Sequence, residues 1–240
     1  ITWDLLVERI NSDLANVLGN LVNRTISMSN KYFEGIVENK NVTETVDEDL
    51  KAVVTTTLSR VSAKMESLRV ADVLTEIFAL FKRCNKYIDE TEPWVLAKDE
   101  AKADRLATVL YNLVEGILIG TSLLEPFMPE TAVKIAAQLN ADIRGFEELD
   151  AFGKYVSGTK VTEKPEILFA RLDVKEVVEK AEALYASRAQ GEAKEEEDTE
   201  PVIDIEAKPE ISYEDFDKLQ FRVGKIIACE EVPKSKKLLC

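Results

Sequence analysis

The sequence of 240 residues contains no histidine, and this absence excludes several classes of function. Without histidine there can be no Ser-His-Asp or Cys-His nucleophile, and the commonest ligand of catalytic metal ions is missing. The only cysteines, Cys84, Cys229 and Cys240, lie far apart and form no C-x-x-C pair. This spacing argues against both a disulfide framework and a cysteine-rich zinc site.

Long hydrophobic runs and glycine-rich phosphate loops are missing as well. The most apolar stretch, residues 113–124, is interrupted by polar and charged residues, so it does not predict a membrane span. The first nine residues carry Asp4, Glu8 and Arg9, unlike a secretory signal. We therefore expect a cytoplasmic protein with no membrane segment.

Basic residues are in short supply, since 31 Lys and Arg face 45 Asp and Glu, for a net charge of −14. Proteins that bind nucleic acid usually carry a basic surface, because neutralising phosphates dominates their affinity. An acidic chain such as this one can bind RNA only through a local patch, or as part of a larger protein that supplies basic surface elsewhere.

Hydrophobic residues recur every three to four positions through most of the first 190 residues, which predicts an all-α antiparallel helical bundle. Within the second helix this spacing directs Met65 and Leu68, among others, toward the core. Residues 141–172 show no regular period. The helices are predicted over residues 2–34, 47–68, 70–88, 104–120, 129–137 and 173–188.

The composition changes twice after the bundle. Residues 190–210 form an acid-rich linker with almost no aromatic residues. Residues 211–240 then predict a short helix over 213–219, a strand over 221–228 and a basic turn. We therefore divide the chain into a helical domain over 1–189, a linker over 190–210 and a separate β-containing segment over 211–240.

Asn20 and Arg24 are four residues apart in the first predicted helix, so they share one of its faces. Apolar residues such as Leu18 and Leu21 occupy the other side. An exposed amide beside a guanidinium can pair with base edges or stack on a base. An ordinary solvated helix face has the same spacing, and it is the more frequent origin of such a pair.

Trp94 directly follows Pro93, where the third predicted helix is broken. Proline fixes the local backbone and could present the indole beside the end of the bundle. An open indole face is a good platform for an unstacked base, worth about 1–3 kcal/mol per base. The alternative is a tryptophan buried as a plug in the end of the bundle, which on its own is the commoner case.

Several segments together resemble the helical anticodon-binding domain of methionyl-tRNA synthetases. No single segment is specific, but their order and spacing match over nearly all of residues 2–188. The segments are Thr2–Asp4, Arg9–Leu14, Gly19–Arg24, Tyr32–Phe33, Glu92–Trp94, Pro126–Ala132 and Pro165–Leu172.

The resemblance implies that Trp94 stacks on the first anticodon base and that Pro93 sets its position. Asn20 and Arg24 would contact anticodon bases on the same side, and the partner would be a methionine tRNA. The parent protein would use ATP and Mg²⁺ in a catalytic domain that carries the His-x-Gly-His signature of class I synthetases. A chain without histidine lacks that signature, so we expect no cofactor and no ligase activity in this chain alone.

The C-terminal segment resembles the start of the tRNA-binding oligonucleotide-fold module appended to many bacterial methionyl enzymes. In that family the module binds tRNA without reading its sequence and can dimerise the enzyme, which raises a homodimer through the complete module. Lys234, Lys236 and Lys237 are candidate contacts to the tRNA backbone, although an exposed lysine turn explains them equally well. Such a fold needs five strands, so the chain ends inside this motif, and it starts at Ile1 without an initiator methionine. We therefore expect both ends of this chain to be fragment ends.

We interpret the sequence as a C-terminal portion of a bacterial methionyl-tRNA synthetase. One alternative is the anticodon domain of another class I synthetase, which the C-terminal module opposes. A second is an all-helical protein-interaction scaffold, which the acidic charge supports and the Asn20, Arg24 and Trp94 set opposes. Exposure of Trp94 separates scaffold from anticodon platform, because only the platform must leave one face of the ring open.

Overall fold

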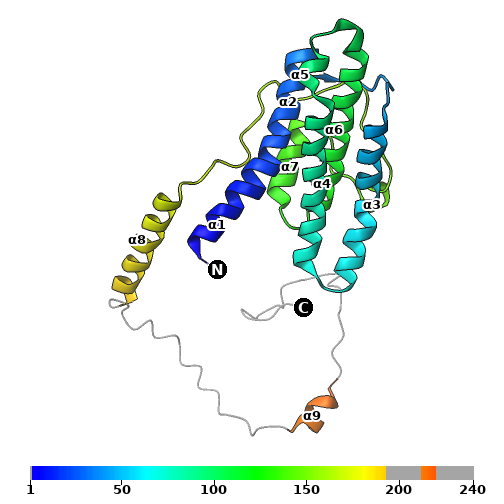
Figure 1. Ribbon diagram of the computed structural model, residues 1–240. Coiled ribbons are helices and arrows are strands. Elements are labelled where there is room, and N and C mark those ends of the chain that lie inside the picture. The colour runs from blue at the N-terminus through cyan, green and yellow to red at the C-terminus, as the bar shows by residue number, and fades with distance from the viewer. Residues whose placement is uncertain (1, 193–211, 220–240) are drawn as a thin grey trace, which may run out of the picture. The chain divides into compact units, whose positions relative to one another are not determined.

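The computed structural model describes residues 2–192 and 212–219, and the predicted all-α bundle is confirmed (Figure 1). The chain divides into two compact units, residues 1–190 and 191–240. The helices of the first unit are α1 (Trp3–Arg9), η1 (Ile10–Gly19), α2 (Asn20–Phe33), α3 (Thr45–Glu66), α4 (Val70–Thr91), α5 (Pro93–Leu96), η2 (Glu100–Lys102), α6 (Ala103–Leu124), α7 (Pro129–Gln138), η3 (Phe146–Glu148) and α8 (Val174–Glu192).

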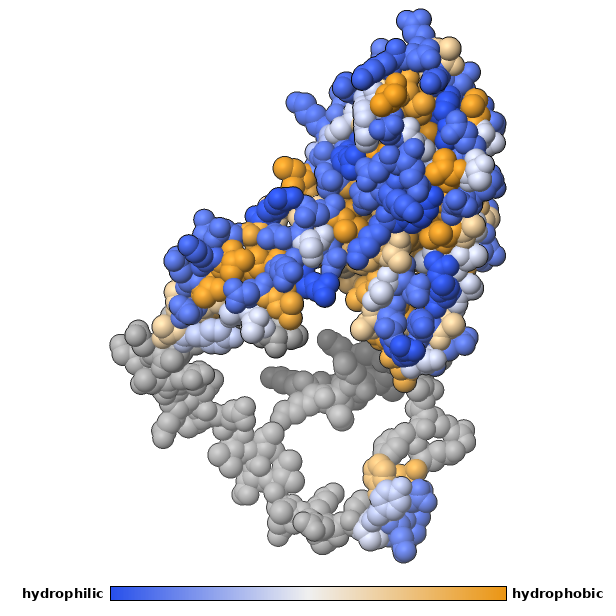
Figure 2. Space-filling model, in the orientation of Figure 1, coloured by the Kyte–Doolittle hydropathy of each residue, from blue (hydrophilic) through white to orange (hydrophobic). Residues whose placement is uncertain are grey.

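The α6 helix forms the centre of the bundle and is buried from Arg105 to Leu124. Together with η2 it is long and apolar enough to cross a membrane, but its apolar window is completely buried among the other helices. Gly120 lets α6 approach α4 closely, since a Cβ at this position would lie 2.6 Å from the Phe81 ring. Figure 2 shows that the face of the bundle turned to the viewer is mostly hydrophilic, with separate apolar patches.

The first predicted helix is continuous but not regular, because its middle part, η1, is a π-helix. The wide turns of this stretch leave a carbonyl accessible, and the side-chain amide of Asn85 donates to the carbonyl of Val17 at 3.0 Å. Insertion of a side chain into the hydrogen-bond ladder is a known cause of such irregularity. The helix ends where Glu34 and Gly35 adopt positive φ angles of 53° and 84°, next to the predicted stop.

The α3–α4 hairpin corrects the prediction for two apolar residues. Leu68 is 85% exposed and Met65 is 42% exposed, although the helical period placed both in the core. The helix ends at Glu66, so the period no longer applies at Leu68, which lies in the turn with φ 55°. Met65 belongs to the last helical turn, where the hairpin reaches solvent.

The irregular segment after α7 is held against α6 by one buried carboxylate. Glu115 receives two hydrogen bonds from the Arg144 guanidinium, at 2.7 and 2.8 Å. The backbone N–H groups of Gly153, Lys154 and Tyr155 donate to the same carboxylate at 2.8–3.0 Å. This anchorage accompanies an antiparallel pairing that the sequence did not predict, between β1 (Ile36–Val37) and β2 (Thr159–Lys160).

The second unit contributes one described element, the short helix α9 (Tyr213–Asp217) within the predicted helix 213–219. The Ser212 hydroxyl accepts the Asp215 N–H at its start, 3.2 Å away. The predicted strand 221–228 and most of the predicted linker lie outside the described residues. The proposed boundaries at 189 and 210 therefore stay predictions.

Candidate nucleic-acid interface

Trp94 projects from a sharp turn between α4 and α5. Glu92 adopts the left-handed conformation, with φ 43° and ψ 62°, and is at once the C-cap of α4 and the N-cap of α5. Its N–H donates to the carbonyl of Ile88 at 3.0 Å, and Pro93 is buried in the first position of α5, where proline is well suited. Trp94 is left 40% exposed, so the expected partial exposure is confirmed.

The first helix and α4 run parallel, which brings Arg24 close to this turn. Their contacts advance together along the chain, from Asp13–Lys82 at 3.8 Å to Val17–Asn85 and then to Arg24–Asp89 at 3.7 Å. Asp89 precedes Trp94 by five residues. Figure 1 accordingly shows α5 at the end of the bundle toward which α2 runs.

Asn20 is the first residue of α2, one turn before Arg24, and its side chain is exposed. Among the residues that the structure describes, neither its amide nor the indole N–H of Trp94 has a hydrogen-bond partner. Both groups are therefore free to bind a ligand. The sequence predicts Asn20, Arg24 and Trp94 at one end of the bundle. The structure brings Arg24 to α4 five residues before Trp94 and leaves Asn20 one helical turn before Arg24.

A cavity of about 350 Å³ adjoins Asn20, between the first helix and the segment 167–171. Gly19 forms part of its wall, and a Cβ at this position would be in ordinary van der Waals contact with the Phe169 ring, 3.5 Å away. The Arg171 guanidinium donates to the Asn16 side chain at the mouth of this cavity. Sequence reasoning did not single out Asn16, Asn23 or Arg171 as lining a site, because Arg171 reaches the helix that carries the two asparagines only when the segment 167–171 folds against it.

Charge around the turn is largely compensated. Arg83 and Lys86 both pair with Glu90, at 2.8 and 3.4 Å, and Arg24 pairs with Asp89. Stacking and directed hydrogen bonds, rather than a strong positive field, are therefore what this surface offers to a nucleic acid. The three candidate lysines of the C-terminal segment, Lys234, Lys236 and Lys237, lie outside the described residues.

The family described as the anticodon binding domain of methionyl tRNA ligase matches residues 37–192. The chain belongs to this family. The family match begins at residue 37 and so does not include Asn20 or Arg24. Curated relatives, by contrast, align with nearly the whole chain. Methionine–tRNA ligase of Clostridium perfringens is 43% identical over 98% of this chain, and that of Clostridium acetobutylicum is 44% identical over the same share.

Solved structures agree with this membership. The free form of Mycobacterium tuberculosis methionyl-tRNA synthetase superposes with a TM-score of 0.67 at 33% identity, over 72% of this chain and 35% of that one. The same enzyme bound to methionyl-adenylate gives a TM-score of 0.65, over 70% of this chain and 33% of that one. This chain spans 36% and 35% of the two clostridial proteins, about a third of their length.

Proposed function

We propose that this chain recognises the anticodon of methionine tRNA as one part of a methionine–tRNA ligase. Trp94 stacks on the first anticodon base, and Asn20 and Arg24 bind the edges of anticodon bases on the same side. Pro93 fixes the turn from which the indole projects. Bases presented in a single-stranded loop suit this arrangement, because their faces and edges are both accessible.

The observation that carries this proposal is the 40% exposure of Trp94 on a capped turn near Arg24. A tryptophan that served only as a core plug would be covered by the neighbouring helices. Its neighbour Pro93 is buried, so the exposure belongs to the ring and not to a loose turn. Stacking contributes about 1–3 kcal/mol per base, and it needs no positive field, which accords with the net charge of −14.

The scaffold alternative is weaker on the same evidence, because it gives no reason for an exposed tryptophan on a capped turn near Arg24. The alternative of another class I synthetase does not fit the family match, which is to the methionyl enzyme. The cavity beside Asn20 adds support, since about 350 Å³ is enough to admit a nucleobase.

Attachment of methionine to tRNA belongs, in this proposal, to a catalytic domain elsewhere in the same cytoplasmic protein. Within residues 2–192 and 212–219 no group of three or more His, Cys, Asp and Glu side chains is placed to hold a metal ion. We place ATP and Mg²⁺ in the catalytic domain, and a homodimer in the complete C-terminal module. Methionine-dependent pyrophosphate exchange by the pure chain would contradict this division of labour.

A titration with anticodon stem-loops tests the proposal. One RNA carries the methionine anticodon CAU, and the matched RNA has the same stem with the first anticodon base changed. We expect the chain to prefer the first RNA by about tenfold or more, since one good base contact discriminates by about 1–3 kcal/mol. Equal affinity for the two stem-loops would overturn the anticodon role.

A further inference from the structure

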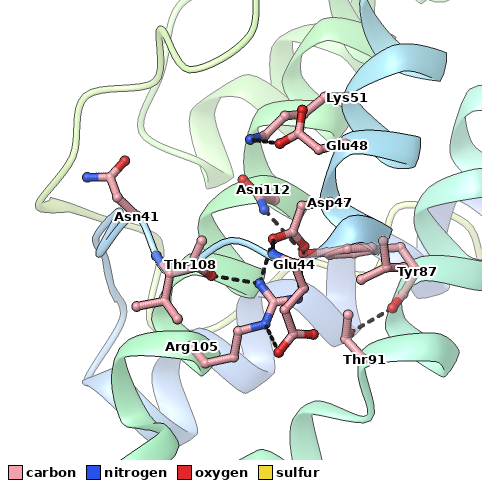
Figure 3. Close-up of polar contacts among 12 residues, drawn as sticks. Asn41, Glu44, Asp47, Glu48, Lys51, Tyr87, Thr91, Arg105, Thr108 and Asn112 are labelled. Carbon is pink, nitrogen blue, oxygen red and sulfur yellow. Dashed lines mark hydrogen bonds and ion pairs between the residues drawn. The ribbon is translucent and has the colours of Figure 1, made fainter.

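A buried polar cluster lies where α3 and α6 begin and α4 ends (Figure 3). Its centre is Asp47, which is fully buried in the first turn of α3. The Arg105 guanidinium donates to both oxygens of this carboxylate, at 2.7 and 2.9 Å. It also donates to the carbonyl of Val42 at 3.0 Å, while Asp47 accepts the Glu44 N–H at 2.8 Å.

Tyr87 of α4 completes this cluster. Its ring is fully buried, and its hydroxyl donates to the Asp47 carboxylate at 2.5 Å. The amide of Asn112 on α6 donates to the same hydroxyl at 3.2 Å. Burial raises the pKa of the Tyr87 hydroxyl, and its hydrogen bond to Asp47 raises that pKa further, so the proton remains available for donation.

The cluster acts on the last turns of α4, the helix that leads into Trp94. Tyr87 lies one turn before the end of α4, where the Thr91 hydroxyl donates back to the Tyr87 carbonyl at 2.7 Å. Glu92, Pro93 and Trp94 then follow without a flexible linker. Arg83 makes a second connection between the same helices, because it donates to Glu90 at 2.8 Å and to the α3 carbonyl of Val46 at 3.4 Å.

Stability alone is a poor reason for such a cluster. Removing two charges from water costs several kcal/mol per ion, and apolar replacements of buried ion pairs are often as stable. Directed hydrogen bonds fix the relative positions of helices, whereas apolar packing tolerates a helix that slides or rotates slightly. Because α3, α4 and α6 all contribute to the hydrogen bonds around Asp47, none of them can slide or rotate without breaking one.

We infer that Tyr87 is a positioning residue for Trp94, holding the end of α4 against α3 and α6 so that the indole presents one fixed face to RNA. The inference rests on the proposed function, because it assigns the cluster a purpose in anticodon binding. Tyr87 itself touches no RNA and acts through the α4–α5 turn.

Tyr87→Phe tests this inference, because it removes the hydroxyl and keeps the ring. The matched control is Tyr111→Phe, since the Tyr111 hydroxyl is also buried and donates to the Tyr155 carbonyl at 2.7 Å. Both variants are made in the full chain with Trp3→Phe, which leaves Trp94 as the only tryptophan. Melting temperature, acrylamide quenching of Trp94 and affinity for the CAU stem-loop are measured for each.

We expect Tyr87→Phe to increase the quenching of Trp94 and to weaken binding of the CAU stem-loop about five- to tenfold, comparable with the loss of one typical hydrogen bond. Tyr111→Phe should lower the melting temperature but leave quenching unchanged and affinity within about twofold. Arg83→Gln, which loosens the same turn from the other side, should resemble Tyr87→Phe and replaces it if that variant does not fold.

The inference is overturned if Tyr87→Phe loses stability as the control does while quenching and affinity stay at the parental values. It is also overturned if the parental chain binds the CAU stem-loop and Tyr87→Phe changes the quenching of Trp94 but keeps the parental affinity for that stem-loop. If the parental chain does not distinguish the two stem-loops, the proposed function fails instead. Quenching of Trp94, which needs no RNA, then decides by itself whether Tyr87 positions the indole.

Discussion

Arg24 on α2 and Asp89 on α4 form an ion pair across two parallel helices, with a nitrogen–oxygen distance of 3.7 Å. The pair ties a proposed base-reading side chain to the helix that presents Trp94. Its side chains are 34% and 69% exposed, so it contributes at most about 1 kcal/mol to stability. Its effect on RNA binding is a separate matter, because Asp89 places a negative charge beside the guanidinium that RNA must reach.

Asp89→Asn should therefore raise the affinity for RNA stem-loops about two- to fivefold at low salt, and the gain should shrink as salt screens the charge. The melting temperature should hardly change. Asp72→Asn is a suitable control, because Asp72 is a partly exposed, paired carboxylate in the first turn of the same helix. A similar gain in both variants would show that only net charge matters.

Trp94→Ala should weaken binding of the CAU stem-loop by about 1–3 kcal/mol and leave helical content intact. Val95→Ala is the matched control, because Val95 is 42% exposed on the same turn and has no flat face for stacking. Circular dichroism melts and RNA titrations are made on both variants. Truncation of a core tryptophan typically costs about 3–5 kcal/mol of stability. A large loss of stability with unchanged RNA binding would therefore favour the alternative that Trp94 is a structural core residue.

Acid should destabilise the bundle partly through Asp47. Burial raises the pKa of Asp47, but hydrogen bonds from Arg105 and Tyr87 outweigh it, and the net pKa lies below the ordinary value of 3.8. A lowered folded-state pKa stabilises the fold above the unfolded-state pKa, and that stability is lost as the pH falls through the folded-state value. The urea concentration at the midpoint of unfolding should therefore decrease as the pH is lowered below about 4.

Asp47→Asn removes this titration, so its urea midpoint should be lower at neutral pH and should decline less between about pH 4 and pH 2. The Asp72→Asn variant again serves as control and should keep the parental slope. If Asp47→Asn retains the parental slope, other carboxylates account for the acid sensitivity.

Gly120→Ala should destabilise the bundle by about 1–3 kcal/mol, a typical cost of overpacking, because the added Cβ meets the Phe81 ring at 2.6 Å. Gly145→Ala provides the comparison. Gly145 has a φ of −66°, and its added Cβ would meet only the flexible carboxylate end of Glu147. Chemical denaturation of both variants measures the difference, and equal stabilities would mean that α4 and α6 separate at little cost.

Sequence alone predicted the helices well because their apolar periods are long and regular. The α6 helix is apolar on almost every side and is buried on every side, and Pro129 opens α7 as expected. It could not predict β1 and β2, since two-residue strands carry no period and form only when residues 36–37 meet 159–160. The predicted burial of Leu68 was wrong for a related reason, because the apolar pattern continues past Glu66, where the helix ends.

The site was only partly predictable for similar reasons. Pro93 marks a break in the sequence, but the residues alone favoured a buried Trp94, and its exposed position was expected only from the resemblance to the methionyl family. The partners of Asp47 are 40 and 58 positions away along the chain, and a lone aspartate near a helix start is indistinguishable from an ordinary cap. Pairings at such separations become visible only when the helices are packed.

Glu92 makes the proposed anticodon surface sensitive to chain length. One residue in the left-handed conformation joins α4 to α5, so the direction of the indole follows directly from the angular register of α4. Each residue of an α-helix advances the register by roughly 100°. A single insertion or deletion between Tyr87 and Glu92 would swing the ring to another side of the bundle, so this stretch can exchange side chains far more readily than it can change length.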